Sequence, residues 1–252
     1  MIALITGATA GIGKSTAYKL AENKWNLILT GRRKDRLEKI KNELEIQFSV
    51  KVITLAFDIR EKQQCHQHLE SLSDEWKQVD VLINNAGLAQ GLATIDKGLE
   101  EDWDTMIDTN IKGLLYVTKI VSNWMIARKK GHIINIGSIA GKEVYPNGNV
   151  YCATKHAVDA LNKAMRMELL PYNIKVSAVH PGMVETEFSL VRFKGNEERA
   201  KQTYQGLQPL TPEDIAESIW WIIQQPTHVN INEIIIVPSV QANTRDVIRN
   251  QN

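Results

Sequence analysis

Short apolar runs of strand length alternate with longer amphipathic segments along this chain, and that alternation restricts the fold more than any other feature. The runs are largely apolar on consecutive residues, which indicates strands buried on both faces. They lie at Ile2–Thr6, Leu27–Thr30, Val52–Phe57, Val79–Ile83, His132–Ile136, Ile174–Val179 and Glu233–Val237. Helices are predicted between them at Ile12–Lys24, Asp35–Gln47, Glu61–Trp76, Asp104–Lys129, Asn149–Leu169 and Pro212–Gln225. This order predicts a three-layer α/β fold, a doubly wound parallel sheet of about seven strands flanked by helices.

The domain organisation follows from the absence of any visible boundary. A chain of 252 residues has room for one or two domains. No linker rich in Pro, Gly or Ser, no break in composition and no internal repeat divides it, so we expect a single domain over residues 1–252. Residues 186–209 are polar and poor in strand character, and they follow the sixth strand. We predict that they form a lid over a ligand.

Charge and composition exclude several classes of protein. Lys and Arg total 30 and Asp and Glu total 29, so the basic excess of a general nucleic-acid binder is absent. No charge-free run is long enough to span a membrane, and the N-terminus lacks the basic region of a secretory signal. Cys65 and Cys152 are too few for a disulfide scaffold at this length, so we expect reduced thiols in a cytoplasmic protein.

A glycine-rich loop, Thr6–Gly13, follows the first strand and opens the first helix. Glycines there permit a tight turn and a close approach of the backbone to a pyrophosphate, which the N-terminus of the helix then binds. The same stretch approximates the phosphate loop of nucleotide hydrolases at Ala8-x4-Gly13-Lys14-Ser15, with Asp58 as the candidate magnesium ligand. That motif requires Gly where this chain has Ala8, so a dinucleotide site is favoured.

The end of the second strand indicates which dinucleotide binds. An NAD site has a carboxylate there for the ribose 2′-hydroxyl, whereas an NADP site has a cation for the 2′-phosphate. Here the strand ends in Thr30-Gly31-Arg32-Arg33, with two guanidinium groups and no acid. Guanidinium groups suit a phosphate dianion, so the sequence predicts NADP.

Tyr151 and Lys155 stand four residues apart near the start of a predicted helix, and therefore share one face. An ammonium near a phenol favours the phenolate and lowers the phenol pKa from its usual value of about 10. Ser138 ends the fifth strand, at the edge of the sheet where ligands bind. Together the three residues predict an acid–base site.

In this order, Thr6–Gly13, Asn84–Gly87, Asn110, Ser138, Tyr151-x3-Lys155 and Pro181-Gly182 resemble the motif series of the classical short-chain dehydrogenase/reductase family. The resemblance spans nearly the whole chain and implies a Rossmann fold. It implies that Tyr151 is the general acid and base, that Lys155 tunes it and holds the nicotinamide ribose, and that Ser138 hydrogen-bonds the reacting oxygen. It also implies that Asn110 supports a proton relay through water.

The same resemblance implies the cofactor contacts, which gather on the loops after the strands. They are Gly7, Thr9, Ala10, Gly11, Ile12, Gly13, Arg32, Arg33, Asp58, Ile59, Asn85, Gly87, Tyr151, Lys155, Pro181, Gly182, Val184 and Thr186. Asp58 is expected at the adenine, and Pro181–Thr186 at the carboxamide side of the nicotinamide. The resemblance further implies a homodimer or tetramer, formed through the predicted helices 104–129 and 149–169.

Within the family, Gly131–Gly141, Glu185–Gly195 and Leu210–Glu217 are similar to the NADP-dependent 3-hydroxy acid dehydrogenases. This similarity implies substrates such as serine, L-allo-threonine, 3-hydroxybutyrate or 3-hydroxypropionate. Their carboxylate needs a cation, for which Arg192 and Lys194 in the predicted lid are candidates, so Ser138, Tyr151 and Arg192 form the expected substrate site. The alternatives are a broad NADPH-dependent carbonyl or dicarbonyl reductase and a non-catalytic NADP-binding redox sensor.

Two histidine-containing segments lie outside these motifs. In Cys65-His66-x-His68 the residues two apart do not share a helix face, so no metal site is predicted there or elsewhere. His180 precedes Pro181 at a strand end, where a packed or loop histidine is favoured over a catalytic one.

Overall fold

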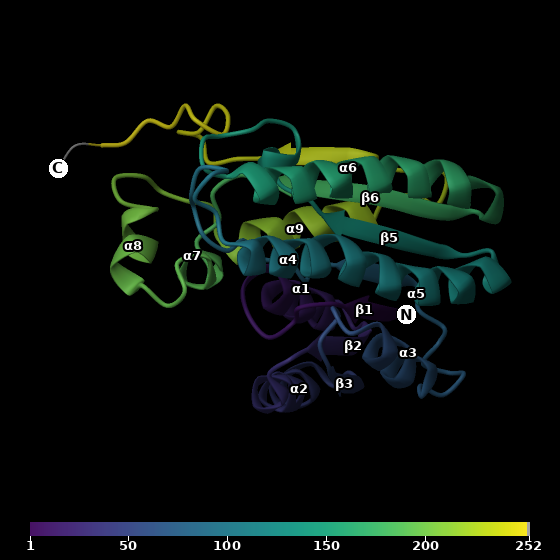
Figure 1. Cartoon of the computed structure of the whole chain (residues 1–252). Coiled ribbons are helices and arrows are strands. Elements are labelled where there is room, and N and C mark those ends of the chain that lie inside the picture. The colour runs from purple at the N-terminus through teal and green to yellow at the C-terminus, as the bar shows by residue number, and fades with distance from the viewer. Residues whose placement is uncertain (251–252) are drawn as a thin grey trace.

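Seven parallel strands form one sheet in the order β3-β2-β1-β4-β5-β6-β7 (Figure 1), in a computed structural model that describes residues 1–250. The strands are β1 (Ile2–Ile5), β2 (Asn26–Gly31), β3 (Val52–Ala56), β4 (Val81–Asn84), β5 (Gly131–Ile136), β6 (Ile174–Pro181) and β7 (Glu233–Ile236). The predicted α/β fold with a doubly wound parallel sheet is confirmed.

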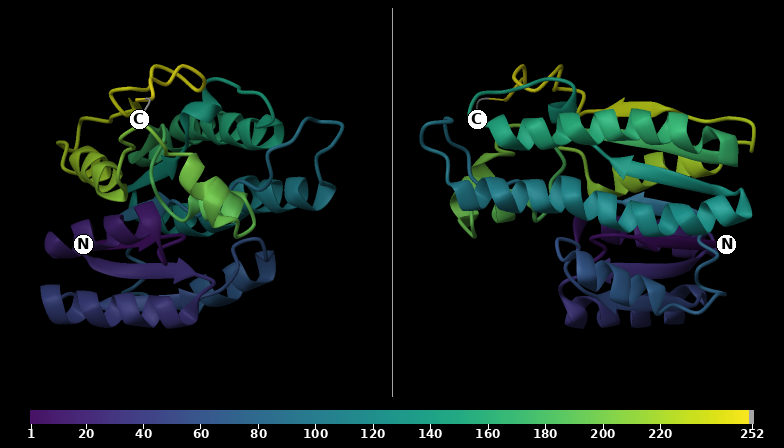
Figure 2. Two further views of the ribbon diagram at one scale, coloured as in Figure 1. Left: turned by 90° about the vertical axis from the view of Figure 1, so that its left-hand side faces the viewer. Right: turned by 45° about the vertical axis from the view of Figure 1, so that its right-hand side comes forward.

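Helices cover both faces of this sheet (Figure 2). They are α1 (Gly11–Glu22), α2 (Lys34–Phe48), α3 (Lys62–Glu70), α4 (Glu100–Ile107), α5 (Leu114–Arg128), α6 (Asn149–Leu169), α7 (Phe188–Arg192), α8 (Glu197–Gln202) and α9 (Pro212–Ile223). A π-helical turn, η1 (Asp108–Gly113), joins α4 to α5, and short 3₁₀ turns lie at η2 (Ile139–Gly141) and η3 (Leu170–Tyr172).

Alternate residues of the central strands face opposite helix layers. Ile5 and Leu29 pack in a core with α1, α2 and α9, whereas Leu4 and Ile28 pack in a second core with α3, α5 and α6. All four side chains are fully buried. The unbroken apolar runs of the sequence arise because consecutive side chains enter these two cores.

Two predicted helices differ in extent from the observed ones. The helix predicted over Glu61–Trp76 ends at Glu70, and turns closed by backbone hydrogen bonds such as Trp76 N to Ser73 O follow it. Ser and Asp favour such turns because their side chains compete for backbone hydrogen bonds. The helix predicted over Asp104–Lys129 begins at Glu100, with three acidic residues in its first turn, and is interrupted by η1.

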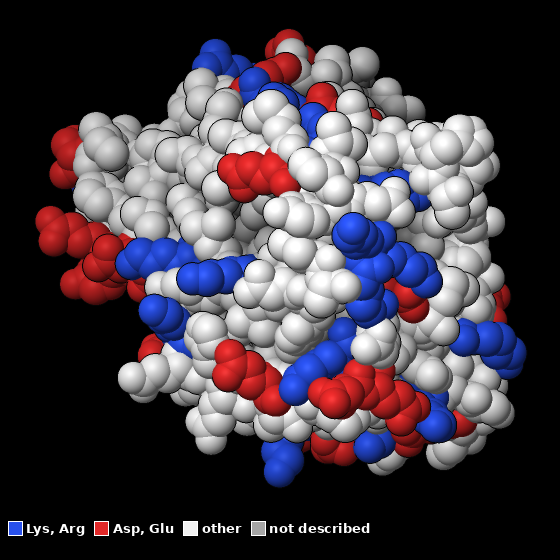
Figure 3. All heavy atoms as spheres, turned by 90° about the vertical axis from the view of Figure 1, so that its right-hand side faces the viewer, with Lys and Arg blue, Asp and Glu red and all other residues white. Residues whose placement is uncertain are grey.

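The strand order changes direction between β1 and β4, which opens a crevice at the carboxyl ends of the strands. Helices α7 and α8 lie at this end, and the chain beyond β7 returns to it (Figure 1). There the Asn250 amide donates to the Gly206 carbonyl at 2.7 Å. On the face shown in Figure 3, Lys and Arg side chains are interspersed with Asp and Glu side chains. None of the helices within residues 1–250 has the length and apolar character needed to cross a membrane.

Candidate active site

A cavity of about 600 Å³ lies at the carboxyl ends of the strands, and most residues of the predicted site line it. Those that line it are Gly7, Thr9, Ala10, Gly11, Ile12, Arg32, Arg33, Asp58, Ile59, Asn85, Gly87, Ser138, Tyr151, Lys155, Pro181, Gly182, Val184, Thr186 and Arg192. Gly13 and Asn110 lie just beneath this lining. The fold therefore brings together residues that are up to 185 positions apart, from Gly7 to Arg192.

The glycine loop forms the floor at one end of the cavity. Gly7 has φ +69°, a conformation that favours glycine, and the Asn85 amide donates to the carbonyl oxygens of Thr6 and Gly7 at 2.8 and 3.1 Å. A Cβ on Gly13 would lie 2.5 Å from the Gly7 carbonyl oxygen, so only glycine lets α1 start this close to the loop. Ala10 precedes the helix and has no side-chain acceptor for its first N–H groups. This cradle fits a pyrophosphate.

Arginine side chains beside the loop already hold an anionic group. Arg33 donates through Nε and Nη2 to Thr9 Oγ1 and through Nη1 to Glu187 Oε2, the last at 2.8 Å. Arg36 donates to the other oxygen of Glu187 at 2.6 Å. These guanidinium groups thus suit a phosphate as well. Sequence reasoning missed Arg36, although it lies in the first turn of α2, three residues after Arg33 at the N-cap.

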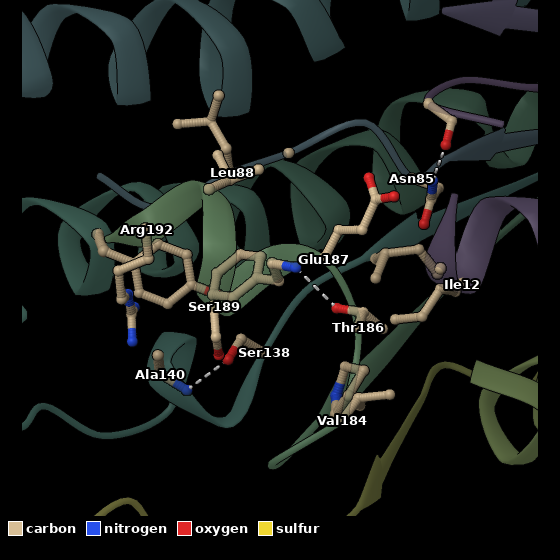
Figure 4. A pocket seen from close by; sticks show the side chains of 18 of the residues that line it. Ile12, Asn85, Leu88, Ser138, Ala140, Val184, Thr186, Glu187, Ser189 and Arg192 are labelled. Atoms are coloured by element: carbon tan, nitrogen blue, oxygen red, sulfur yellow. Dashed lines mark hydrogen bonds between the residues drawn. The ribbon is translucent and has the colours of Figure 1, made fainter. Parts of the chain in front are cut away.

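Helix α6 and the turn after β5 bring the predicted catalytic residues together. Tyr151 and Lys155 lie one turn apart on α6 and are both buried, and the Lys155 ammonium donates to the Ile136 carbonyl at 2.9 Å. Ser138 caps η2, where its hydroxyl accepts from the Ala140 amide at 3.0 Å (Figure 4). The Ser138 hydroxyl lies near the Tyr151 phenol and opposes the rise of its pKa. Both residues line the cavity.

Burial dominates the pKa values of Tyr151 and Lys155. Burial raises the pKa of the Tyr151 phenol above its usual range, and the nearby Tyr145 adds to that rise. The groups that oppose it are Arg192 and the hydroxyl of Ser138, not Lys155. Burial also lowers the pKa of Lys155 to about 8. Desolvation therefore outweighs the effect of the nearby ammonium that the Tyr-x3-Lys spacing predicts.

Asn110 lies in the π-helical turn η1 under the cavity floor. Its amide nitrogen donates to the Leu88 carbonyl at 2.8 Å and to Thr154 Oγ1 at 3.0 Å, and its oxygen accepts from the Leu88 amide at 2.9 Å. A Cβ on Gly87 would approach both Asn110 Oδ1 and Lys155 Nζ, at 3.3 and 3.5 Å. Asn110 and Lys155 thus flank Gly87, and π-helical turns are frequent at functional sites.

The two candidate cations of the lid point to different places. The Arg192 guanidinium lies 5.0 Å from the centre of the Tyr151 ring and donates to the Tyr145 hydroxyl at 2.7 Å. Its Nε is buried and has no hydrogen-bond partner among residues 1–250. Lys194 instead pairs with Asp102 at 2.8 Å. Sequence reasoning missed Tyr145, which carries no motif and is identified only by its contact with Arg192.

Comparisons with known proteins identify the family of the chain. The profile of the short chain dehydrogenase family matches residues 1–197. The chain is 47% identical to the NADP-dependent 3-hydroxy acid dehydrogenase YdfG of Salmonella typhi over 96% of both chains, and 43% identical to the NADP-dependent 3-hydroxy acid dehydrogenase of Schizosaccharomyces pombe over 98% of this chain and 96% of that one. The closed form of serine dehydrogenase complexed with NADP+ superposes with a TM-score of 0.92 at 44% identity over the full length of both chains. The chain belongs to the short-chain dehydrogenase family.

Proposed function

We propose that the protein is an NADP-dependent dehydrogenase that oxidises the hydroxyl-bearing carbon of small 3-hydroxy acids. The observation that carries the substrate class is the Arg192 guanidinium, which lies in the cavity beside the Tyr151 ring with an unpartnered Nε among the described residues. A substrate carboxylate at Arg192 would place its hydroxyl near Ser138 and Tyr151. A rise in NADPH absorbance with L-serine tests this, and no rise with any 3-hydroxy acid would contradict it.

The residues present fit NADP. The glycine loop and the start of α1 would hold the pyrophosphate, and Arg33 with Arg36 and Arg32 would hold the 2′-phosphate. Asn85, Gly87 and the segment Pro181–Thr186 would hold the nicotinamide half, with Asp58 at the adenine. When bound, the oxidised nicotinamide supplies a positively charged ring that accepts a hydride from the substrate carbon.

The side chains around the reacting oxygen divide the proton chemistry among them. Tyr151, as phenolate, removes the hydroxyl proton of the alcohol while Ser138 donates a hydrogen bond to the oxygen that becomes the carbonyl. Lys155 would hold the nicotinamide ribose and would keep a positive charge near the phenol. Asn110 supports a water through which Tyr151 passes its proton to solvent.

The cofactor assignment predicts a selective loss in Arg33→Gln. Because Arg33 offers three donor nitrogens to the proposed 2′-phosphate site, its loss should weaken NADP binding by about 10- to 100-fold. NAD binding should change little. Isothermal titration with both cofactors measures this, with Lys34→Gln, an exposed cation next in the chain, as the matched control. Equal losses for NADP and NAD would contradict the assignment.

We also propose that residues 186–209 act as the lid of this single domain. Contacts at three places support closure over the cavity: Glu187 with Arg33 and Arg36, Lys194 with Asp102, and the Arg192 carbonyl with the Gly91 amide at 3.0 Å. We further propose a cytoplasmic homodimer or tetramer that associates through residues 104–129 and 149–169. Light scattering of the purified protein tests the assembly.

A further inference from the structure

A cluster of charged side chains lies behind the turn that carries Ser138, outside the set of residues that line the cavity. The Lys142 ammonium is 2.8 Å from Asp159 Oδ1 and 2.6 Å from Glu233 Oε2. The His180 ring is fully buried, and its Nε2 lies 3.7 and 3.6 Å from the same two carboxylate oxygens. The ammonium groups of Lys142 and Lys163 together balance the charge of the two carboxylates, so the cluster needs no metal ion.

The cluster joins the elements that build the catalytic site. Lys142 follows η2, four residues after Ser138, whereas Asp159 lies on α6 one turn beyond Lys155. Glu233 is the first residue of β7, whose register pairs it with Ala178 on β6, the strand of His180. The Lys142 ammonium therefore links the turn that carries Ser138 to α6, the helix of Tyr151, and to β7 at the edge of the sheet.

The turn that carries Ser138 is closely packed at both of its ends. His180 Nδ1 lies 3.3 Å from the Ser138 carbonyl oxygen, and a Cβ on Gly137 would come within 2.4 Å of the same nitrogen. A Cβ on Gly141 would lie 2.5 Å from the Lys155 carbonyl oxygen. The imidazole thus packs against the start of the turn, and α6 against its end.

Loss of the ammonium would leave a strained cluster. The ligand atoms of Asp159, His180 and Glu233 lie within 4.8 Å of one another, so the two carboxylates would repel without Lys142 between them. Although burial opposes it, hydrogen bonds to Asp159 and Glu233 raise the pKa of Lys142, which keeps the ammonium charged. Lys163 pairs with the other oxygen of Asp159 at 2.8 Å, but it lies on α6 itself and does not tie that helix to another element.

We propose that Lys142 is a positioning residue, which through Asp159, Glu233 and His180 holds the Ser138 hydroxyl in register with Tyr151. The proposal rests on the role of Ser138 in the proposed function, and it concerns the alignment of the serine and not the identity of the substrate. Misplacement of a catalytic group by about 1 Å costs on the order of 100-fold in rate, so the expected effect is on kcat.

The test compares Lys142→Met with Lys163→Met, which removes an ammonium from the same carboxylate without freeing the serine turn. Lys142→Met should lower kcat by about 10- to 100-fold, with the KM of the substrate and the Kd of NADPH unchanged, and Lys142→Arg should recover most of the rate. Lys163→Met should keep kcat within about twofold, as expected for a surface ion pair. Equal losses in Lys142→Met and Lys163→Met would overturn the proposal.

A double-mutant cycle distinguishes positioning from a general loss of stability. In a Ser138→Ala background, Lys142→Met should lower kcat no further, because the group that it positions is already gone. An undiminished loss in that background would overturn the proposal. If Lys142→Met does not fold, Glu233→Gln replaces it, with a smaller loss of kcat and the same dependence on Ser138. The rates of all variants are measured with a substrate that the wild-type enzyme turns over. A wild-type enzyme that turns over no 3-hydroxy acid would contradict the proposed substrate class, whereas the comparison among variants tests the role of Lys142.

Discussion

Tyr151→Phe is expected to lose about 10²- to 10⁴-fold in kcat while it keeps its affinity for NADPH. The change removes only the phenolic oxygen, which the proposed mechanism uses to accept the proton of the substrate. The ring that remains can still pack edge-on against Phe188, at the observed centroid separation of 5.6 Å. Steady-state rates give the loss of kcat, and fluorescence titration gives the Kd of NADPH.

Tyr116→Phe is the matched control, because it removes a phenolic hydroxyl from α5, outside the cavity lining. It should retain full turnover and the same thermal stability as the wild type. Turnover by Tyr151→Phe at more than about a tenth of the wild-type rate would contradict its assignment as the general acid and base.

Arg192→Met is expected to raise the KM for a 3-hydroxy acid by about 10- to 100-fold, because a charge-assisted hydrogen bond contributes about 1.5–3 kcal/mol. The KM for an uncharged alcohol or diketone should change far less, because such substrates have no carboxylate. Lys194→Met is the matched control: the same charge is removed two residues away in the lid, where Lys194 pairs with Asp102. Equal effects of Arg192→Met on charged and uncharged substrates would overturn its role in substrate binding.

Arg192 also predicts a change in the pH profile. Its charge opposes the burial that raises the pKa of Tyr151, so its removal should raise that pKa further. Oxidation needs the phenolate, and its rate therefore rises as the pH passes through the phenol pKa. In Arg192→Met this rise should begin at higher pH than in the wild type, measured with an uncharged alcohol to avoid the loss of carboxylate binding. An unchanged profile would contradict the coupling.

Much of the fold and site was predictable because it depends on local patterns. The continuous apolar runs required a sheet covered on both faces, and the positions of Gly7, Ser138 and Tyr151 relative to those runs placed them at one edge. The roles of these residues in the reaction stay predictions, although the structure brings them around one cavity.

The features that the sequence did not reveal depend on contacts between distant residues. Arg33 and Glu187 are 154 positions apart, Tyr145 and Arg192 are 47 apart, and Lys142 and Glu233 are 91 apart. No spacing rule joins such pairs, because their separation is set by how the loops cross the end of the sheet. The degree of burial of a side chain also cannot be derived from a motif. The raised pKa of Tyr151 therefore could not be predicted, because it follows from desolvation in the folded structure.

The most direct measurement is the rate of NADPH formation by the wild-type enzyme with a set of matched substrates. These are L-serine, L-allo-threonine, 3-hydroxybutyrate and 3-hydroxypropionate, each with NADP and with NAD, beside the reduction of a simple diketone with NADPH. We predict the highest kcat/KM for a 3-hydroxy acid with NADP. A preference for the diketone would favour a broad carbonyl reductase, and binding of NADP without turnover of any substrate would favour a redox sensor; either result would contradict the proposed function.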